Sequence, residues 1–345
     1  RGRRQALNGL CAIENEAGNR LDSYRWCTAH AQEVWDFPGA GAVYMCNAGE
    51  SARSVFRLDE AERYYLEAAR RDVAWYANPW MHLADLYLRA GRLAQSASAV
   101  RNMHEYARRR PSHTEQQDAS ERSRTVATLL LVAGRPHRAL PITERAVRFP
   151  DRRGGQSRSP EVDRATAALL HRRALLDAAE VVVEQGSTRG FFGRLGPALR
   201  ASWLRLRALR AERQAVAILE DESILRGLLE AESHMAQGTP PWLASELVEV
   251  VGPGPVLASL RTSRQGLAAP GLAAYLDAYE AEARAATADW EQAEEAAERA
   301  LEGLPAGEAL LRARAQLVLA LSSEAEGRLG EAAGRYLELL QADAT

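Results

Sequence analysis

The chain has 345 residues, of which 46% are hydrophobic and 6% aromatic, and its 44 basic residues, all arginine, nearly balance 46 acidic residues. Abundant alanine and leucine with few aromatic residues favour helices over sheets. The use of arginine in place of lysine is typical of a GC-rich genome, and it excludes a P-loop lysine, a Schiff base and a serine–lysine pair. No apolar run reaches the roughly 20 residues that a membrane-spanning helix needs.

The first 40 residues predict a helical cap that ends at the Pro- and Gly-rich segment 38–41. All three cysteines lie in or just after this region: Cys11, Cys27 and Cys46. We expect free thiols in a reducing compartment. The alternatives are a Cys27–Cys46 disulfide in an exported protein and a zinc site that adds His30. Because the paired-cysteine knuckles of zinc modules are missing, we expect no metal and no cofactor.

A phrase made of a small residue, a turn and an amphipathic helix recurs after the cap. It occurs at 56–61, 91–97, 134–140, 289–293 and 327–333. Leu58 and Leu93 are 35 residues apart, and Trp290 and Leu329 are 39 apart. A period of about 34 residues with insertions indicates stacked helical hairpins.

The clearest copy of this repeat spans 80–91. Its large, small and turn positions are Trp80, Leu83, Ala84, Tyr87 and Gly91. Here, and at the Ala61–Tyr65–Ala68 spacing of the preceding repeat, the chain resembles the tetratricopeptide repeat family. The resemblance covers about 42–150 and 271–340, and it implies an all-α, right-handed superhelical solenoid of helical hairpins. Its small residues are expected to let the two helices of each hairpin approach closely.

The pattern weakens in the middle of the chain. One long helix is predicted at 160–185, a glycine-rich linker at 186–196, helices at 198–219 and 221–236, and two shorter helices within 240–265. We therefore divide the chain into a cap at 1–40, tetratricopeptide-like repeats at 41–155, degenerate helical hairpins at 156–268 and C-terminal repeats at 269–345. A boundary near 186–197 between two superhelical halves is the alternative.

The near-neutral total charge hides a basic middle and an acidic C-terminal end. Sixteen Arg stand against eight acidic residues in 101–173, seven against one in 189–213, and six against fifteen from 277 to the end. Basic segments that bind nucleic acid carry interleaved aromatic residues, which this stretch lacks at regular spacing. We expect no nucleic-acid partner. The basic stretch is either a solvated arginine face or a surface for an acidic protein partner.

Patterns of known catalytic sites are absent from the sequence. The seven histidines form no HExxH motif, no Gly-x-Ser-x-Gly elbow occurs, and the lone Gly-x-Gly at 39–41 follows no predicted strand. We therefore expect no catalytic and no cofactor-binding residues, and a protein that is not an enzyme.

The resemblance implies a concave groove lined by the first helix of each hairpin, next to exposed arginines where one hairpin closes. Together they give the expected partner-binding residues: Glu50, Arg53, Met81, Asp85, Arg89, Arg108, Arg109, Arg110, Arg124, Thr128 and Glu282. The acidic members depart from the basic clamp of chaperone-binding relatives, so a chaperone C-terminus is not the expected ligand.

We expect a non-enzymatic scaffold or adaptor that binds other proteins, alone or as a subunit of a larger assembly. The alternative is the sensor or oligomerisation arm of a larger signalling ATPase or transcription regulator whose catalytic domain lies upstream of Arg1. A cytoplasmic location is favoured, with an exported or membrane-anchored form left open by the missing initiator methionine. The oligomeric state is not predicted.

Overall fold

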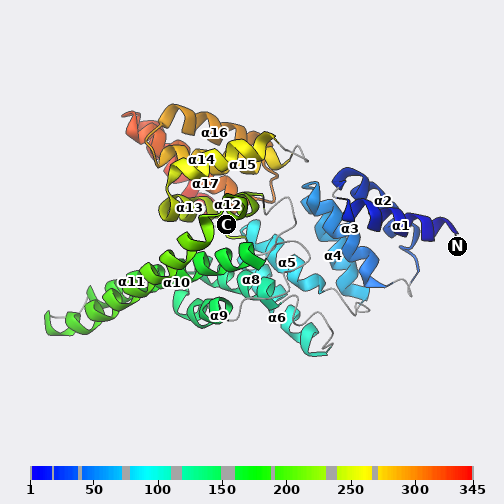
Figure 1. The fold of residues 1–345 in the computed structure, drawn as a ribbon, viewed down its shortest axis with the longest axis horizontal. Helices are drawn as coiled ribbons and strands as arrows, with labels where there is room; N and C mark the ends of the chain where they lie inside the picture. Colours follow the sequence, from blue (N-terminus) through cyan, green and yellow to red (C-terminus); the bar gives the residue numbers. More distant parts are fainter. Residues whose placement is uncertain are drawn as a thin grey trace.

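The computed structural model confirms the predicted all-α class (Figure 1). It describes residues 2–17, 19–37, 41–71, 78–109, 119–148, 160–187, 191–230, 239–265 and 271–343, and these contain helices and no strand. None of the helices in these ranges is both long enough and apolar enough to cross a membrane.

The N-terminal part consists of three helical hairpins in chain order (Figure 1). Their helices are α1 (Gly2–Glu16), α2 (Arg20–Glu33), α3 (Ala42–Ser54), α4 (Leu58–Arg71), α5 (Pro79–Arg89) and α6 (Leu93–Arg109). Helix α5 begins where Asn78 accepts a hydrogen bond from the Trp80 N–H and Pro79 occupies the first helical turn. Such a start satisfies backbone donors that the helix itself leaves unpaired.

The middle of the chain forms a short hairpin and a long one. Their helices are α8 (Ala119–Val132), α9 (Pro136–Arg148), α10 (Pro160–Ser187) and α11 (Phe191–Leu219). The α10–α11 hairpin extends beyond the body of the molecule (Figure 1). The linker predicted at 186–196 is wrong over most of its length, because α10 runs to Ser187 and α11 already begins at Phe191.

The C-terminal part begins with three short helices and ends with two hairpins. They are α12 (Glu222–Leu229), α13 (Leu243–Val251), α14 (Pro253–Gln265), α15 (Leu272–Ala285), α16 (Trp290–Gly303), α17 (Ala309–Ala325) and α18 (Leu329–Asp343). The break predicted within 240–265 is confirmed, since Gly252, with a φ of 86°, separates α13 from α14.

One backbone turn underlies all five copies of the repeat phrase. Each turn contains a residue with positive φ: Phe56, Gly91, Gly134, Ala288 and Gly327. At the second copy, the Gly91 N–H donates to the Leu88 carbonyl (3.0 Å) and the Arg92 N–H to the Tyr87 carbonyl (2.8 Å). The same two hydrogen bonds recur at the other four turns. This is a Schellman motif, which ends one helix and aims the chain into the next.

The small residues of the repeats lie at helix–helix contacts, as predicted. Ala61, Ala84, Ala139, Ala293 and Ala300 are fully buried. At Gly49 the approach of α3 to α4 is so close that a Cβ atom would lie 2.6 Å from Cε1 of Tyr65. Interiors packed this tightly depend on small residues opposite large ones.

Packing does not follow chain order alone, because the C-terminal helices also contact the N-terminal hairpins. Helix α17 packs against α5, and the Phe56 ring lies 4.9 Å from the Tyr275 ring of α15. A Cβ atom at Gly271 would meet the Phe56 ring at 2.1 Å. The two repeat regions therefore touch each other directly across more than 200 residues of sequence.

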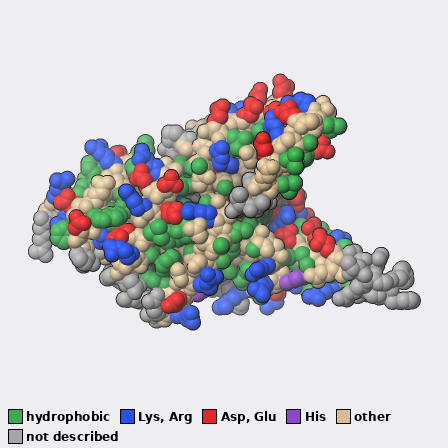
Figure 2. Space-filling model, turned by 180° about the vertical axis from the view of Figure 1, so that it is seen from behind, with side chains coloured by type: hydrophobic (Ala, Val, Ile, Leu, Met, Phe, Trp, Pro, Cys, Tyr) green, Lys and Arg blue, Asp and Glu red, His purple; other side chains and the backbone are tan. Residues whose placement is uncertain are grey.

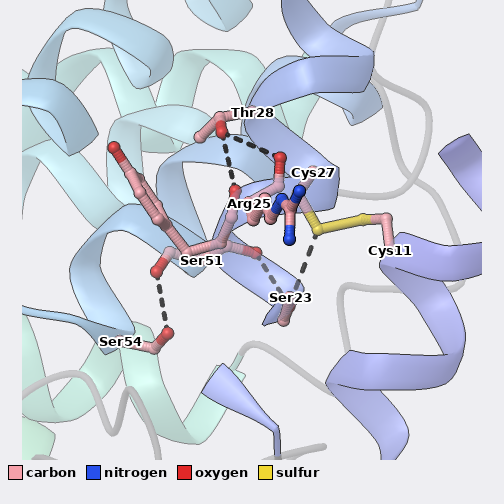
Figure 3. Close-up of a disulfide and its surroundings, with 8 residues drawn as sticks. Cys11, Ser23, Arg25, Cys27, Thr28, Ser51 and Ser54 are labelled. Atoms are coloured by element: carbon pink, nitrogen blue, oxygen red, sulfur yellow. Dashed lines mark hydrogen bonds between the residues drawn. A yellow bond between two sulfur atoms is a disulfide. The ribbon is translucent and has the colours of Figure 1, made fainter. Parts of the chain in front are cut away.

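The structure overturns the cysteine predictions. Cys11 of α1 and Cys27 of α2 form a disulfide with Cα atoms 4.8 Å apart (Figure 3). Cys46 is a free, buried thiol. Free Cys11 and Cys27 thiols and a Cys27–Cys46 bridge are both wrong. The zinc alternative also fails, since the disulfide removes two of its thiolates. The sequence left the pairing open because three cysteines allow three different bridges.

Candidate functional site

Three of the expected partner-binding residues meet in a buried ion-pair network between α3, α5 and α17. Nη2 of Arg53 lies 2.6 Å from Oδ2 of Asp85, and Nε of Arg89 lies 3.1 Å from the same oxygen. Nη1 of Arg89 donates to both carboxylate oxygens of Glu308, each at 3.1 Å. Glu308 also accepts a hydrogen bond from the Tyr275 hydroxyl at 2.7 Å.

This ion-pair network lies in the contact between the two repeat regions and links them. The side chains of Arg53, Asp85, Arg89 and Glu308 are all less than one-tenth exposed. Charges removed from water in this way are tolerated only when they are paired and hydrogen-bonded. Here Arg89 of the N-terminal repeats is paired with Glu308, a carboxylate of the same chain.

The remaining groove positions form separate local contacts. Arg124 of α8 pairs with Asp163 of α10 at 2.9 Å, and both are buried, as are Met81 and Thr128. Glu50 is partly exposed and faces the His82 imidazole at 3.3 Å.

Glu282 of α15 is joined to Arg314 of α17. Nε of Arg314 lies 2.5 Å from Oε1 of Glu282, and Ser245 of α13 hydrogen-bonds to both side chains. Burial alone would lower the pKa of Arg314, but the Glu282 carboxylate raises it above its usual value. The arginine is therefore held in its charged form.

The structure describes the three arginines expected at the hairpin end to different extents. Arg108 is exposed near the end of α6. The Arg109 side chain and the whole of Arg110 lie outside the described residues.

Most groove positions are thus covered by other helices of the same chain. Arg89 contacts Glu308 at the start of α17 and is joined to Arg53 through Asp85, whereas Arg124 and Glu282 lie in two other clusters. A partner reaches the first cluster only where α17 moves away from α5. Binding through these residues stays a prediction.

A second charge cluster, partly buried, joins α10, α11 and α13. The Arg172 guanidinium contacts Glu212, Glu246 and Glu249 at 2.9, 2.6 and 2.9 Å. Burial raises the pKa of Glu246, and the neighbouring Arg172 opposes that rise. Among the described residues, no group of three or more His, Cys, Asp or Glu side chains is arranged to hold a metal ion. The cluster therefore fixes three helices relative to one another through paired charges.

A cavity of about 370 Å³ lies beside this cluster, between α8, α10, α17 and α18 and the segment before α13. Its walls are mainly apolar and include Leu131, Trp242, Leu310, Leu317 and Leu339. Its charged groups are paired, since Arg173 lies 2.7 Å from Asp177 and Arg314 holds Glu282. Cavities of this size and character accommodate small apolar molecules.

An exposed apolar surface lies on α11. Leu199, Trp203, Leu206 and Leu209 are 71, 55, 51 and 51% exposed. The opposite side of the helix, which includes Ala201, Leu204 and Ala208, is buried against α10. We call the exposed side the α11 face.

Arginines surround these apolar residues. Arg200, Arg205, Arg210 and Arg213 are exposed, and no described residue forms an ion pair with them. Arg207 stacks over the Trp203 ring at 4.7 Å and pairs with Glu144 of α9 at 3.2 Å. The α11 face therefore combines exposed apolar area with positive charge that no residue of the described ranges pairs.

The sequence indicated part of this face but not its position. The excess of arginine in 189–213 was visible, and so was the helix at 198–219. Apolar residues recur all round this helix, so the pattern did not reveal which of them would face α10. Only the structure shows that Leu204 is buried against α10 while Leu206 is exposed.

No family model matches the chain, and no curated protein matches it in sequence.

Proposed function

We propose that the chain is a non-enzymatic, tetratricopeptide-like scaffold that binds a protein partner through the α11 face. The observation that carries this proposal is the exposure of Leu199, Trp203 and Leu206, each more than half accessible on a helix that projects from the body. Exposed apolar patches of this kind mark interaction sites, and Trp and Arg are the residues most enriched where binding energy concentrates.

The charge of the α11 face selects an acidic partner surface. Its four unpaired arginines attract carboxylates and repel other basic surfaces, which speeds association and suppresses wrong partners. Without a regular aromatic ladder, the same charge gives only weak, salt-sensitive attraction to nucleic acid.

The tetratricopeptide-like part of the proposal is supported by two observations. The same Schellman turn recurs at the five repeat phrases, and neighbouring helices pack in hairpins along the chain. A right-handed superhelical path through these hairpins is part of the proposal.

The test compares proteins captured from an extract of the source cells by three forms of the chain. The α11 variant carries Arg210→Glu and Arg213→Glu, and the control carries Arg25→Glu on α2 and Arg101→Glu on α6, an equal change of charge at exposed positions. We expect the wild type and the control to enrich the same proteins and the α11 variant to lose them. Equal capture by all three forms would overturn the role of the α11 face, and tight binding of a random DNA duplex at physiological salt would overturn the protein-binding function.

The cavity favours a second candidate function, the sensor arm of a larger regulator. Its volume of about 370 Å³ suits a small apolar effector. The fluorescent probe 1-anilinonaphthalene-8-sulfonate tests it: we expect binding that Ala313→Trp abolishes by filling the cavity and that Leu206→Ser on α11 leaves intact. Equal probe binding by the wild type and Ala313→Trp would argue against a ligand site here.

A further inference from the structure

A cavity of about 410 Å³ lies between α1, α2 and the start of α3, and we call it the N-terminal cavity. The polar side chains that line it come from α1 and α2 and are Arg4, Gln5, Asn8 and His30. The apolar and aromatic side chains of its lining are Val34, Phe37 and Tyr44. No carboxylate of the described residues lines this cavity, and its volume is typical of sites for small molecules.

Arg4 supplies a positive charge that the protein leaves available. Its guanidinium carbon lies 3.8 Å from the centre of the Phe37 ring, and no carboxylate of the described residues pairs with it, whereas the neighbouring Arg3 pairs with Glu33 at 3.7 Å. Stacking on a ring leaves the N–H donors of a guanidinium available, and two of these donors can bind one carboxylate in parallel. Acidic side chains gather instead on the lobe formed by the C-terminal helices (Figure 2), which lies apart from α1 (Figure 1).

His30 adds a polar group without a charge. Its side chain is 4% exposed, and its ring meets the Tyr44 ring edge to face with the centroids 4.5 Å apart. Burial lowers the pKa of His30, the Arg4 charge lowers it further, and the Glu33 carboxylate opposes both effects. The imidazole is therefore neutral at pH 7, and Arg4 supplies the single charge of the lining. One positive charge matches a carboxylate better than a phosphate, which carries nearly two negative charges at this pH.

The disulfide holds the two polar walls of the N-terminal cavity against each other. Cys11 lies three residues after Asn8 on α1, and Cys27 lies three residues before His30 on α2. Each half of the bridge is thus about one helical turn from a polar residue of the cavity. Walls that are fixed before a ligand arrives lose less conformational freedom when it binds. The covalent link therefore favours a preformed site.

We propose that the N-terminal cavity binds a small organic monocarboxylate with an aromatic or apolar body. The carboxylate accepts hydrogen bonds from the Arg4 guanidinium and the Asn8 amide, and the body packs against Val34 and Tyr44. This site goes beyond the proposed function, because it uses none of the residues of the α11 face. Loss of protein capture by the α11 variant would leave it untouched, and failure of the test below would leave the protein-binding proposal untouched.

Isothermal titration calorimetry of the purified 345-residue chain at pH 7 tests the proposal with three probes: 2-naphthoate, the neutral 2-naphthamide and 2-naphthyl phosphate. We expect the wild type to bind 2-naphthoate at least about tenfold more tightly than either of the other two. Arg4→Gln should weaken 2-naphthoate binding by about tenfold or more, because it removes the charged donor, and should leave 2-naphthamide binding unchanged.

Arg3→Gln is the matched control, since it removes the same charge one residue away, from a side chain that is 79% exposed and does not line the cavity. It should bind 2-naphthoate like the wild type, and so should Ala313→Trp, which fills the cavity beside α17. Circular dichroism checks that each variant is folded. A wild type that binds no 2-naphthoate, equal weakening by Arg3→Gln and Arg4→Gln, loss of binding in Ala313→Trp, or tighter binding of 2-naphthyl phosphate would each overturn the proposal.

Discussion

At the scale of single residues, the three cysteines differ in chemistry. Cys11 and Cys27 hold the first hairpin together, with the Ser23 hydroxyl 3.6 Å from the Cys27 sulfur (Figure 3). Cys46 of α3 lies in the hydrophobic core, and burial raises the pKa of its thiol well above the usual value. A protonated and inaccessible thiol reacts slowly, because the thiolate is the nucleophile.

Alkylation with iodoacetamide should count these states. We expect no label on the native chain, one on the denatured chain and three on the denatured and reduced chain, since one thiol is buried and two are in the disulfide. Mass spectrometry reads the number directly. Three labels without reduction would mean that the disulfide does not form in the purified protein.

The Schellman turns lead to a second prediction at this scale. Gly327 has a φ of 76° with open space around its Cα, so Gly327→Ala tests backbone strain alone. We expect it to lower the free energy of unfolding by about 1 kcal/mol. Ala288 has a φ of 57°, and Ala288→Gly should raise that free energy by about 0.5 kcal/mol, because relief of strain exceeds the entropy gained by the unfolded chain. Urea unfolding measures both, and shifts in the same direction would contradict the common turn.

At the scale of helices, the spacing of residues within the repeat phrase predicted more of the structure than the residue types did individually. The positions of Ala84 and Gly91 within 80–91 were enough to predict a tight contact and a turn, because both depend on local spacing. The linker at 186–196 was predicted from its glycine content, whereas α10 runs to Ser187 and α11 begins at Phe191. The exposed side of α11 could not be predicted, because the packing of Ala201, Leu204 and Ala208 against α10 is not visible in the sequence.

Overpacking tests the helix contacts. Ala84 of α5 and Ala293 of α16 are fully buried, so Ala84→Leu and Ala293→Leu should each destabilise the chain by about 1–3 kcal/mol. Ala94 is exposed on α6, and Ala94→Leu is the control, with an expected change below about 0.5 kcal/mol. Thermal unfolding gives the comparison. If all three variants melt together, the helices do not meet at these alanines.

At the scale of the whole molecule, the main departure from a simple array is the contact of α5 with α17. A sequence period reports only neighbours in the chain, so it contains no signal for the pairing of Arg89 with Glu308. The groove residues were predicted to face a concave groove, and the pattern held no sign that Arg53, Asp85 and Arg89 would form buried ion pairs reaching Glu308. Whether helices so far apart in the sequence meet, which we call closure, depends on the cumulative geometry of many hairpins.

Removing Arg89 tests this closure. Its side chain is 8% exposed and links Asp85 of α5 to Glu308, whereas Arg148 of α9 is 68% exposed and pairs with Glu144. Arg89→Ala leaves buried carboxylates without their partner and should cost about 3–5 kcal/mol, while Arg148→Ala should cost less than about 1 kcal/mol. Urea unfolding measures both costs.

The contact of α5 with α17 also predicts a change of shape in the folded Arg89→Ala variant. When α17 is released from α5, we expect a larger radius of gyration by small-angle X-ray scattering and faster amide exchange in both helices, because each loses a packed neighbour. Arg148→Ala should leave both measurements unchanged. If Arg89→Ala were no more costly than Arg148→Ala and kept the wild-type radius, the contact between α5 and α17 would not hold the two repeat regions together, and Arg53, Asp85 and Arg89 would be open to a partner as the groove prediction requires.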